Sequence, residues 1–561
     1  MFRQIAQTRQ DGQLRIDAGV SPARRVGIND DDDNANDSLI SAPHSSAHDV
    51  NGLSCLLLVA RFLISLHPDH ATGKYHHRPP RRAPIEVCLA ILQFTMRASA
   101  IVQTLLGLSA TASAAQVTLD LSSESAVKST ASTLAYGLMK FYNGNQTGGI
   151  PGLLPGPYYW WEAGGMFGHL IDYWYYTGDA SYNAVTMEGM MHQITPKGDY
   201  LPVNQTNAMG NDDQGFWALT SMMAAEAVFP NPPSDTPQWL AGVQAVFNEY
   251  AVRWEEENGL CGGGLRWQVY SFLNGWAYKN SISNGCFFNI AARLARYTGN
   301  ATYGEWAQKI FDWEVKEGLI TQDYIIYDGI EVDDATKSCK NIHQVQFTYN
   351  AGVWLQGAAA MYDYNKSDTW KGHVNGILNY TERTFFKDGI MYEPACETVH
   401  TCDQNMVSFK GYLIRFLAAA AKLCPWTTDS ITKLISTAAQ DAIKVCNGPN
   451  GPKYPGPDGT GCGFSWLNGT NDGLMGVGPQ MDALAAVFYT LLPNVKAPAT
   501  GQDRGTSKGN AGAGSSQAQP LPEPRAITGG DRAGAAILTI LIAAGILAGS
   551  FFVTSDVFSF A

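Results

Sequence analysis

Between residues 119 and 493, apolar residues recur at the spacing of amphipathic helices, and few stretches alternate between apolar and polar positions. One helix-breaking turn occurs twice: Tyr-Thr-Gly-Asp-Ala-Ser-Tyr at 176–182 returns as Tyr-Thr-Gly-Asn-Ala-Thr-Tyr at 297–303. A glycine after Tyr-Thr predicts a left-handed helix end, after which a new helix begins. With further turns at 230–235, 363–369 and 424–427, pairs of helices recur at intervals of roughly sixty residues.

The first helix of each pair is rich in Gly and Ala, which allows helices to crowd around a common axis. We expect these inner helices at 164–176, 212–229, 285–297, 350–362, 408–423 and 479–492. The alternate helices, such as 306–315, are more conventionally amphipathic. Six inner and six outer helices predict an all-α fold, an (α/α)6 barrel of six helical hairpins over residues 116–495.

The N-terminal part of the chain lacks this pattern. Residues 1–95 contain an acidic run and many small polar residues, and we interpret them as a disordered or mis-annotated N-terminal extension. Residues 96–115 combine a Met-Arg start, an apolar run and the sequence Ala-Ser-Ala-Ala. These are the three parts of a secretory signal peptide, so we expect the true start to be Met96.

The C-terminal part has the composition of a linker followed by a hydrophobic tail. Residues 496–532 are rich in Gly, Ala, Ser, Gln and Pro. Within the C-terminal segment 533–561, an apolar run covers 533–553, and only eight residues follow it, with no Lys or Arg among them. We therefore predict a GPI anchor signal rather than a retained transmembrane span. The candidate attachment residues are Asn510, Gly512 and Ser515.

Glycosylation sequons and cysteines also indicate a secreted protein. Six Asn-x-Ser/Thr sequons lie between the two terminal signals, at Asn145, Asn204, Asn300, Asn365, Asn379 and Asn468. Eight cysteines lie in the same region without the spacing of a zinc site, so they predict disulfides with the pairing left open. We expect a protein that is secreted and GPI-anchored at the plasma membrane and cell wall.

The composition narrows the choice of partner. The formal net charge of −12 and the pI near 5.4 argue against a nucleic-acid partner. Charged residues are only 16%, whereas aromatic residues, Gly and Asn are abundant, a balance that suits a carbohydrate-active protein.

Two adjacent carboxylates, Asp212 and Asp213, stand at the entrance of the second inner helix, with Gly210 and Gly215 on either side. One interpretation is that Asn211 or Asp212 caps the helix. A hard-cation site is a second, but the neighbouring residues supply no further regularly spaced oxygen ligands, and we expect no metal and no cofactor. The third is a catalytic pair, one neutral and one ionised, as glycoside hydrolysis requires.

The other inner-helix entrances carry aromatic and amide side chains that would meet the pair at one mouth of the barrel. Such side chains suit a sugar-binding groove. The residues expected to bind the sugar are Trp160, Trp161, Glu162, Asn211, Gln214, Asn280, Ser283, Asn284, Tyr349 and Asn350. The acidic segment 328–334 lacks this placement, and we interpret it as a solvated loop.

Three segments carry a resemblance to a known family. Trp-Trp-Glu-Ala-Gly at 160–164, Gly-Asn-Asp-Asp-Gln at 210–214 and Lys-Asn-Ser-Ile-Ser-Asn-Gly at 279–285 resemble glycoside hydrolase family 76. The resemblance covers about 119–493. Within this family, the chain most resembles the fungal cell-wall branch of mannan endo-1,6-α-mannosidases, whose members are secreted and GPI-anchored.

The resemblance implies a retaining mechanism with Asp212 as the nucleophile and Asp213 as the general acid/base. It implies α-1,6-mannan or the mannose-containing glycan of GPI proteins as the donor, and a β-glucan acceptor if the enzyme transfers the glycan rather than hydrolysing it. Two alternatives stay open. One is an inverting hydrolase or a polysaccharide lyase on the same barrel, and the other is a non-catalytic, wall-anchored glycan-binding protein.

Overall fold

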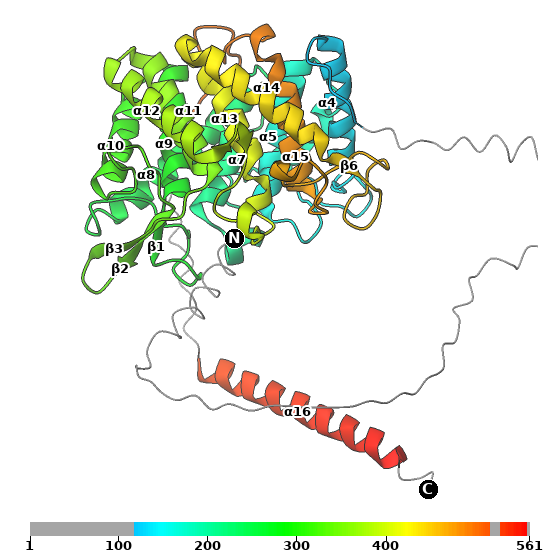
Figure 1. Ribbon diagram of the computed structural model, residues 1–561. Coiled ribbons are helices and arrows are strands. Elements are labelled where there is room, and N and C mark those ends of the chain that lie inside the picture. The colour runs from blue at the N-terminus through cyan, green and yellow to red at the C-terminus, as the bar shows by residue number, and fades with distance from the viewer. Residues whose placement is uncertain (1–116, 516–527, 558–561) are drawn as a thin grey trace, which may run out of the picture. The chain divides into compact units, whose positions relative to one another are not determined.

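Twelve long helices in two layers dominate residues 117–515 (Figure 1). The computed structural model describes residues 117–515 and 528–557. The inner helices are α5 (Trp160–Thr177), α7 (Asn211–Glu226), α9 (Ser281–Thr298), α11 (Thr348–Asn365), α13 (Phe409–Leu423) and α15 (Val477–Phe488). The outer helices are α4 (Glu124–Met139), α6 (Asn183–Gln193), α8 (Trp239–Glu256), α10 (Ala301–Lys316), α12 (Asp368–Phe385) and α14 (Thr428–Lys444).

The inner helices form a closed ring. Each packs on the next along the chain, and α15 packs back on α5, while an outer helix returns the chain between successive inner ones. This is the predicted (α/α)6 barrel, and all six inner helices lie where the Gly and Ala pattern placed them. Because outer helices alternate with inner ones, the inner helices all begin at one end, called the mouth here, and end at the other, called the floor.

Glycines on the inner helices make this close packing possible. A Cβ atom on Gly164 would lie 2.9 Å from the Trp217 ring, and one on Gly352 would lie 2.5 Å from the Phe416 ring. A larger residue at either position would push neighbouring inner helices apart. The repeated turn also folds as predicted, because Gly178 ends α5 and Gly299 ends α9 in the left-handed conformation.

Short strands gather at the mouth, where Figure 1 shows β1–β3 and β6 at the same end of the barrel. Strands β1 (Tyr278–Asn280), β2 (Gly329–Asp333) and β3 (Ser338–His343) form an antiparallel sheet in that order. Two smaller hairpins pair β4 (Phe386–Lys387) with β5 (Ile390–Met391) and β6 (Cys446–Gly448) with β7 (Gly461–Cys462). The interpretation of 328–334 as a solvated loop is therefore wrong, because most of it is the central strand of the mouth sheet.

Short 3-10 helices complete the connections. They are η1 (Val203–Ala208), η2 (Glu397–Val399), η3 (Met406–Ser408), η4 (Pro425–Thr427), η5 (Trp466–Asn468) and η6 (Tyr489–Asn494).

The described cysteines form three disulfides, Cys261–Cys339, Cys396–Cys402 and Cys446–Cys462. Cys286 and Cys424 are buried with free thiols. The prediction of disulfides is thus right for six of the eight cysteines and wrong for these two. Cys286 lies on inner helix α9 and Cys424 directly follows α13, so both are packed as small apolar side chains.

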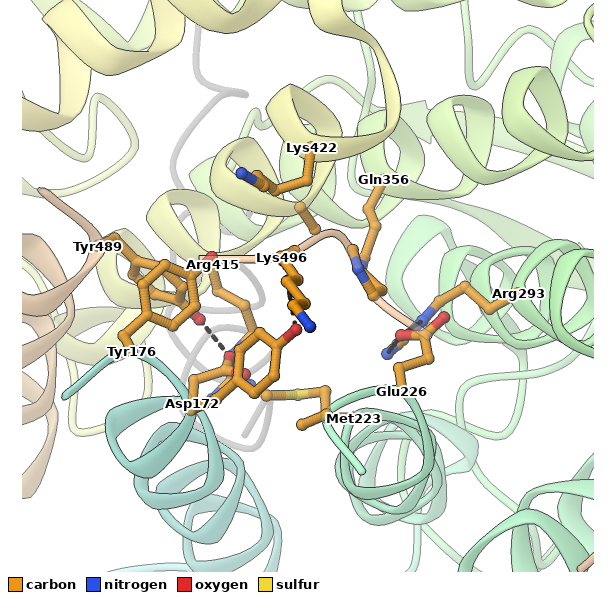
Figure 2. A pocket seen from close by; sticks show the side chains of 14 residues that line it. Asp172, Tyr176, Met223, Glu226, Arg293, Gln356, Arg415, Lys422, Tyr489 and Lys496 are labelled. Carbon is orange, nitrogen blue, oxygen red and sulfur yellow. Dashed lines mark hydrogen bonds and ion pairs between the residues drawn. The ribbon is translucent and has the colours of Figure 1, made fainter. Parts of the chain in front are cut away.

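The floor is held together by charged side chains around a cavity of about 50 Å³ (Figure 2). Arg293 pairs with Glu226 at 2.6 Å, and Arg415 lies 3.6 Å from Asp172, which also accepts a hydrogen bond from the Tyr489 hydroxyl. The first ion pair joins α9 to α7, and the second joins α13 to α5. We therefore interpret the cluster as a closure of the barrel floor.

Residues 496–515, called the strap here, also belong to the folded unit. The Ala499 N–H donates to the Glu226 carbonyl at 2.8 Å, and the Asn510 N–H donates to Gln244 Oε1 at 2.6 Å. The Asn248 amide donates to the Ala513 carbonyl at 2.7 Å, which holds the end of the strap on α8. The linker predicted to begin at 496 thus packs on the barrel as far as Ser515.

Helix α16 (Gly529–Val557) contains an apolar stretch, Arg532–Ser550, that is long enough to cross a membrane. This helix coincides with the predicted hydrophobic tail, and both a GPI signal and a retained span would produce it. The predicted N-terminal extension and signal peptide, residues 1–115, lie outside the described residues.

Candidate active site

The entrance of α7 is fixed by backbone pairing to the next mouth segment. The Asn211 N–H donates to the Trp267 carbonyl at 2.7 Å, and the Val269 N–H donates to the Met209 carbonyl at 3.0 Å. The Trp267 N–H in turn donates to the Tyr278 carbonyl at 2.7 Å. The segment that carries the two aspartates is therefore attached to the mouth sheet.

The helix cap differs from the expectation that Asn211 or Asp212 would provide it. The N-cap residue is Gly210, and the Asp213 carboxylate accepts its N–H at 2.9 Å. The Asn211 amide instead donates to the Arg266 carbonyl, also at 2.9 Å, and Asp212 Oδ1 accepts the Asp213 N–H at 3.1 Å. The third residue of the helix therefore returns to the N-cap, as in a capping box.

The two carboxylates converge on one point. Asp212 Oδ1 and Asp213 Oδ2 both lie within 2.5 Å of the position that a Cβ atom on Gly210 would occupy, so these oxygens are at most about 5 Å apart. The Asp212 side chain is buried and that of Asp213 is half-buried. This upper limit is shorter than the roughly 6.5–9.5 Å of inverting glycosidases, so the pair is closer to the arrangement of retaining enzymes, whose carboxyl groups are roughly 5–5.5 Å apart.

Burial raises the pKa of both carboxyl groups. The pKa of Asp213 is raised to about 6, chiefly by burial, against the stabilising N–H of Gly210. The pKa of Asp212 is raised well above its ordinary value by burial and then by the charge of Asp213. Because two adjacent buried carboxylates resist double ionisation, the pair holds one shared proton near neutral pH.

Aromatic side chains form the wall beside the pair. The Tyr250 hydroxyl donates to the Asn211 carbonyl, which supports the first turn of α7. The Tyr349 ring stacks on Phe409, with centroids 3.8 Å apart and planes 5° apart, and lies parallel to Phe216 at 6.4 Å. Burial raises the pKa of the Tyr349 hydroxyl well above its ordinary value, with further contributions from the charges of Asp328 and Asp212, so this hydroxyl is neutral.

Four of the predicted sugar-binding residues carry buried polar atoms that accept or donate no hydrogen bond within the described parts of the chain. These atoms are Asn280 Nδ2, Ser283 Oγ, Tyr349 Oη and both amide atoms of Asn350. They come from the entrances of α9 and α11. Buried polar groups are normally satisfied, so such atoms mark positions that ordered water or a ligand hydroxyl can serve.

Five other predicted residues have their polar atoms engaged within the protein. Trp160 Nε1 donates to Gln193 Oε1 at 2.8 Å, and Trp161 Nε1 donates to Asn405 Oδ1 at 3.1 Å. Asn211 forms hydrogen bonds with Arg266 and Arg253. Gln214 forms them with Glu249 and Arg253. Asn284 accepts the backbone N–H of Leu265. Both indole rings are buried, so these residues support the mouth, and their contact with substrate stays a prediction.

Glu162, the tenth predicted residue, is fully buried at the start of α5. Its carboxyl group accepts the Tyr159 N–H at 2.6 Å and the Gln404 amide at 3.1 Å. Burial raises its pKa to about 8. Glu162 therefore caps its own helix as a neutral acid at the mouth.

Sequence reasoning missed three residues of the mouth. Trp267 follows a run of glycines and supplies the strand-like contact to the pair, whereas Asp328 accepts the Tyr278 hydroxyl at 2.7 Å. Glu393 accepts the Thr348 hydroxyl at 2.5 Å and so fixes the start of α11. The three glycines before Leu265-Arg266-Trp267 were the sequence signal that could have pointed to Trp267. No sequence signal pointed to Asp328 or Glu393.

An (α/α)6 barrel with a buried and a half-buried carboxylate converging at its mouth has the arrangement of a glycoside hydrolase. The model of glycosyl hydrolase family 76 matches residues 126–502, and the chain belongs to this family.

Comparison with individual proteins agrees with the assignment to this family. The chain is 44% identical over 436 residues to mannan endo-1,6-alpha-mannosidase DCW1 of Saccharomyces cerevisiae, covering 77% of this chain and 94% of that protein. It is 41% identical to DFG5 of the same yeast, covering 77% and 93%. Among solved structures, Dfg5 from Chaetomium thermophilum in complex with glucosamine is 45% identical, with a TM-score of 0.66 and coverage of 70% and 97%.

Proposed function

We propose that the protein is a retaining, endo-acting α-1,6-mannosidase or transglycosidase. The observation that carries this proposal is the convergence of the Asp212 and Asp213 carboxylates at the mouth of a family 76 barrel. Relatives that are 41–44% identical along almost their whole length bear the name mannan endo-1,6-alpha-mannosidase. The same geometry argues against an inverting mechanism, which needs space for a water between its carboxyl groups.

In the proposed reaction, the ionised Asp212 carboxylate attacks the anomeric carbon while Asp213 donates its proton to the leaving oxygen. The glycosidic bond breaks as the ester to Asp212 forms, and Asp213 is left ionised. Asp213 then takes a proton from water or from an acceptor hydroxyl, whose oxygen displaces Asp212 from the anomeric carbon. At the end of the reaction, Asp212 is again ionised and Asp213 is again protonated.

These roles place the shared proton on Asp213 when substrate is bound. In the ligand-free protein, Asp212 is the more deeply buried of the two and its pKa is raised further. The convergence of Asp212 Oδ1 and Asp213 Oδ2 allows the proton to pass between them as the sugar binds. Substrate contacts that stabilise charge on Asp212 would favour this transfer.

We propose α-1,6-mannan or the mannose-containing glycan of GPI proteins as the donor. A β-glucan hydroxyl is the proposed acceptor when transfer replaces hydrolysis. The names of the yeast relatives support the mannan donor. The polar atoms of Asn280, Ser283 and Asn350 at the mouth are suited to sugar hydroxyls.

We also propose that the protein is secreted and anchored by a GPI lipid at the plasma membrane and cell wall. All six predicted glycosylation sequons have exposed asparagines, and the described part of the chain forms three disulfides. The apolar helix α16 supports a C-terminal anchor signal. Of the attachment candidates, Asn510 and Gly512 lie where the strap is bonded to α8, and Ser515 is at its end.

Product analysis with purified protein tests the enzymatic proposal. The protein is incubated with α-1,6-linked mannooligosaccharides, with and without a β-glucan oligosaccharide, and the products are separated by mass. We expect internal cleavage, and mannosyl-glucan products when the acceptor is present. Asp212→Asn should abolish both, and Asp213→Asn should slow both by at least about 100-fold, while the circular dichroism spectrum stays unchanged. Binding without cleavage by the wild type would instead support a wall-anchored glycan-binding protein.

A further inference from the structure

Gly210 lies at the point where the two catalytic carboxylates meet. A Cβ atom on this residue would lie within 2.5 Å of Asp212 Oδ1 and of Asp213 Oδ2. It would also lie 3.2 Å from Trp267 Nε1, so the indole closes another side of the same space. Gly210 is itself buried, which leaves no open direction for a side chain.

The backbone at this position does not require glycine. Gly210 has φ −91° and ψ 157°, in the extended region that every L-residue adopts. A glycine is also dispensable at a helix N-cap, where Ser, Asn and Asp serve as well or better. The remaining reason for glycine is steric: among the described residues, and leaving aside the two chain neighbours of Gly210, the atoms within 3 Å of the missing Cβ belong to the two carboxylates.

We infer that Gly210 is a positioning residue, whose missing side chain lets Asp212 and Asp213 converge to the separation that a retaining mechanism needs. This inference rests on the proposed function of the pair. A methyl group at this position would force at least one carboxyl group to rotate away. The Asp213 carboxylate would then leave the Gly210 N–H that it accepts at 2.9 Å.

The collision falls on side-chain ends, which turn about their own bonds, rather than on backbone. We therefore expect Gly210→Ala to fold and to lose catalysis. A displacement of about 1 Å between reacting groups can lower a rate about 100-fold. Separating the carboxylates also weakens their mutual repulsion, which brings their two apparent pKa values closer together.

The chain offers a matched control in Gly476, which is the N-cap of another inner helix, α15. Its backbone is extended, and the nearest atom to an added Cβ is the Tyr158 hydroxyl at 3.2 Å, with no carboxylate near it. Gly476→Ala changes an inner-helix N-cap in the same way without touching the pair. It should retain activity within about threefold.

The test measures kcat and its pH profile for the wild type, Gly210→Ala and Gly476→Ala on an α-1,6-mannooligosaccharide. We expect Gly210→Ala to lose at least about 100-fold in kcat, with a narrower pH profile whose alkaline limb moves to lower pH. Wild-type kcat and an unchanged profile in Gly210→Ala would overturn the inference while leaving the proposed function intact. An inactive wild type would instead reject the proposed function.

A second variant covers the case in which Gly210→Ala does not fold. Asp212→Ala together with Asp213→Ala removes both colliding carboxylates, so adding Gly210→Ala to this double variant should change its melting temperature by only a few degrees. A triple variant that melts far below the double variant would show that the added methyl collides with something else, and this would overturn the inference.

Discussion

Asp212 Oδ1 accepts the backbone N–H of Asp213 at 3.1 Å, so the Asp212 carboxyl group is positioned by the backbone of its neighbour. Asp213 in turn holds the N–H of the N-cap residue, and these bonds set both carboxyl groups before a substrate arrives. The inner-helix entrance thus acts as a preorganised support for two carboxylates.

The two aspartates should differ in their dependence on the leaving group. Asp213→Asn removes the proton donor, so we expect a natural mannoside to be cleaved about 100- to 10,000-fold more slowly. An aryl mannoside with an acidic phenol needs no proton donor and should still form the glycosyl-enzyme. Asp212→Asn should cleave neither substrate. Mass spectrometry of the trapped ester measures the difference, and the reverse pattern would exchange the two roles.

The pH profile should show the buried pair. The pKa of Asp213 is raised to about 6, and one proton must leave the pair before a nucleophile exists. We therefore expect kcat/KM to rise with pH through an apparent pKa of about 6, rather than through the ordinary value near 4. Steady-state kinetics between pH 4 and about 8 would test this. An acid limb near pH 4 would show that burial does not control the pair.

Stability should fall as the pH rises, because of buried acids away from the mouth. Glu314 on α10 is fully buried, and burial raises its pKa to about 8. Between about pH 4.5 and about 8 the folded state keeps a proton that the unfolded state releases, so the free energy of unfolding decreases. Glu314→Gln should leave stability near pH 5 unchanged and raise it at pH 8 by at least about 1.4 kcal/mol.

Denaturant unfolding of the two proteins at both pH values measures this effect. Glu305→Gln, an exposed change on the same helix, is the control and should not alter the difference between pH 5 and pH 8. An equal effect of Glu314→Gln at both pH values would contradict the assignment of a buried, protonated carboxyl group.

The disulfide Cys261–Cys339 should matter more than Cys396–Cys402. The first joins residues 78 apart and attaches the loop that leads to Trp267 to β3, whereas the second closes a separation of 6. By loop entropy, Cys261→Ser with Cys339→Ser should lower the free energy of unfolding by about 2 kcal/mol more than the change at the other pair. Reducing gels and thermal melts provide the measurement, and equal losses would argue against the entropic account.

The repeating elements could be predicted from the sequence, but the mouth could not be. Glycines and alanines recur where inner helices crowd, and Gly178 and Gly299 end helices in local conformations that the sequence encodes. The place of Asp212 and Asp213 in the first turn of an inner helix could also be predicted, because it depends only on local sequence, whereas their catalytic role stays a proposal.

The predictions that were wrong concern residues whose environment depends on contacts between segments distant in the sequence. The sequence suggested that Asp328 is solvated. In the structure it directly precedes β2, which pairs with β3, and it is buried beside Tyr278. Cys286 and Cys424 counted toward an even set of cysteines, but their burial in and beside inner helices leaves each without a partner thiol among the described residues. The strap has a linker's composition, and only its bonds to α8 and to the floor show that it is folded.

The anomeric configuration of the first product tests the central claim most directly. Proton NMR during the first minutes of cleavage of an α-1,6-mannooligosaccharide distinguishes the α-anomer from the β-anomer before they equilibrate. Two carboxylates at most about 5 Å apart predict a covalent intermediate and a first product with the α-configuration. A first product with the β-configuration would contradict the assignment of Asp212 and Asp213 as a retaining catalytic pair.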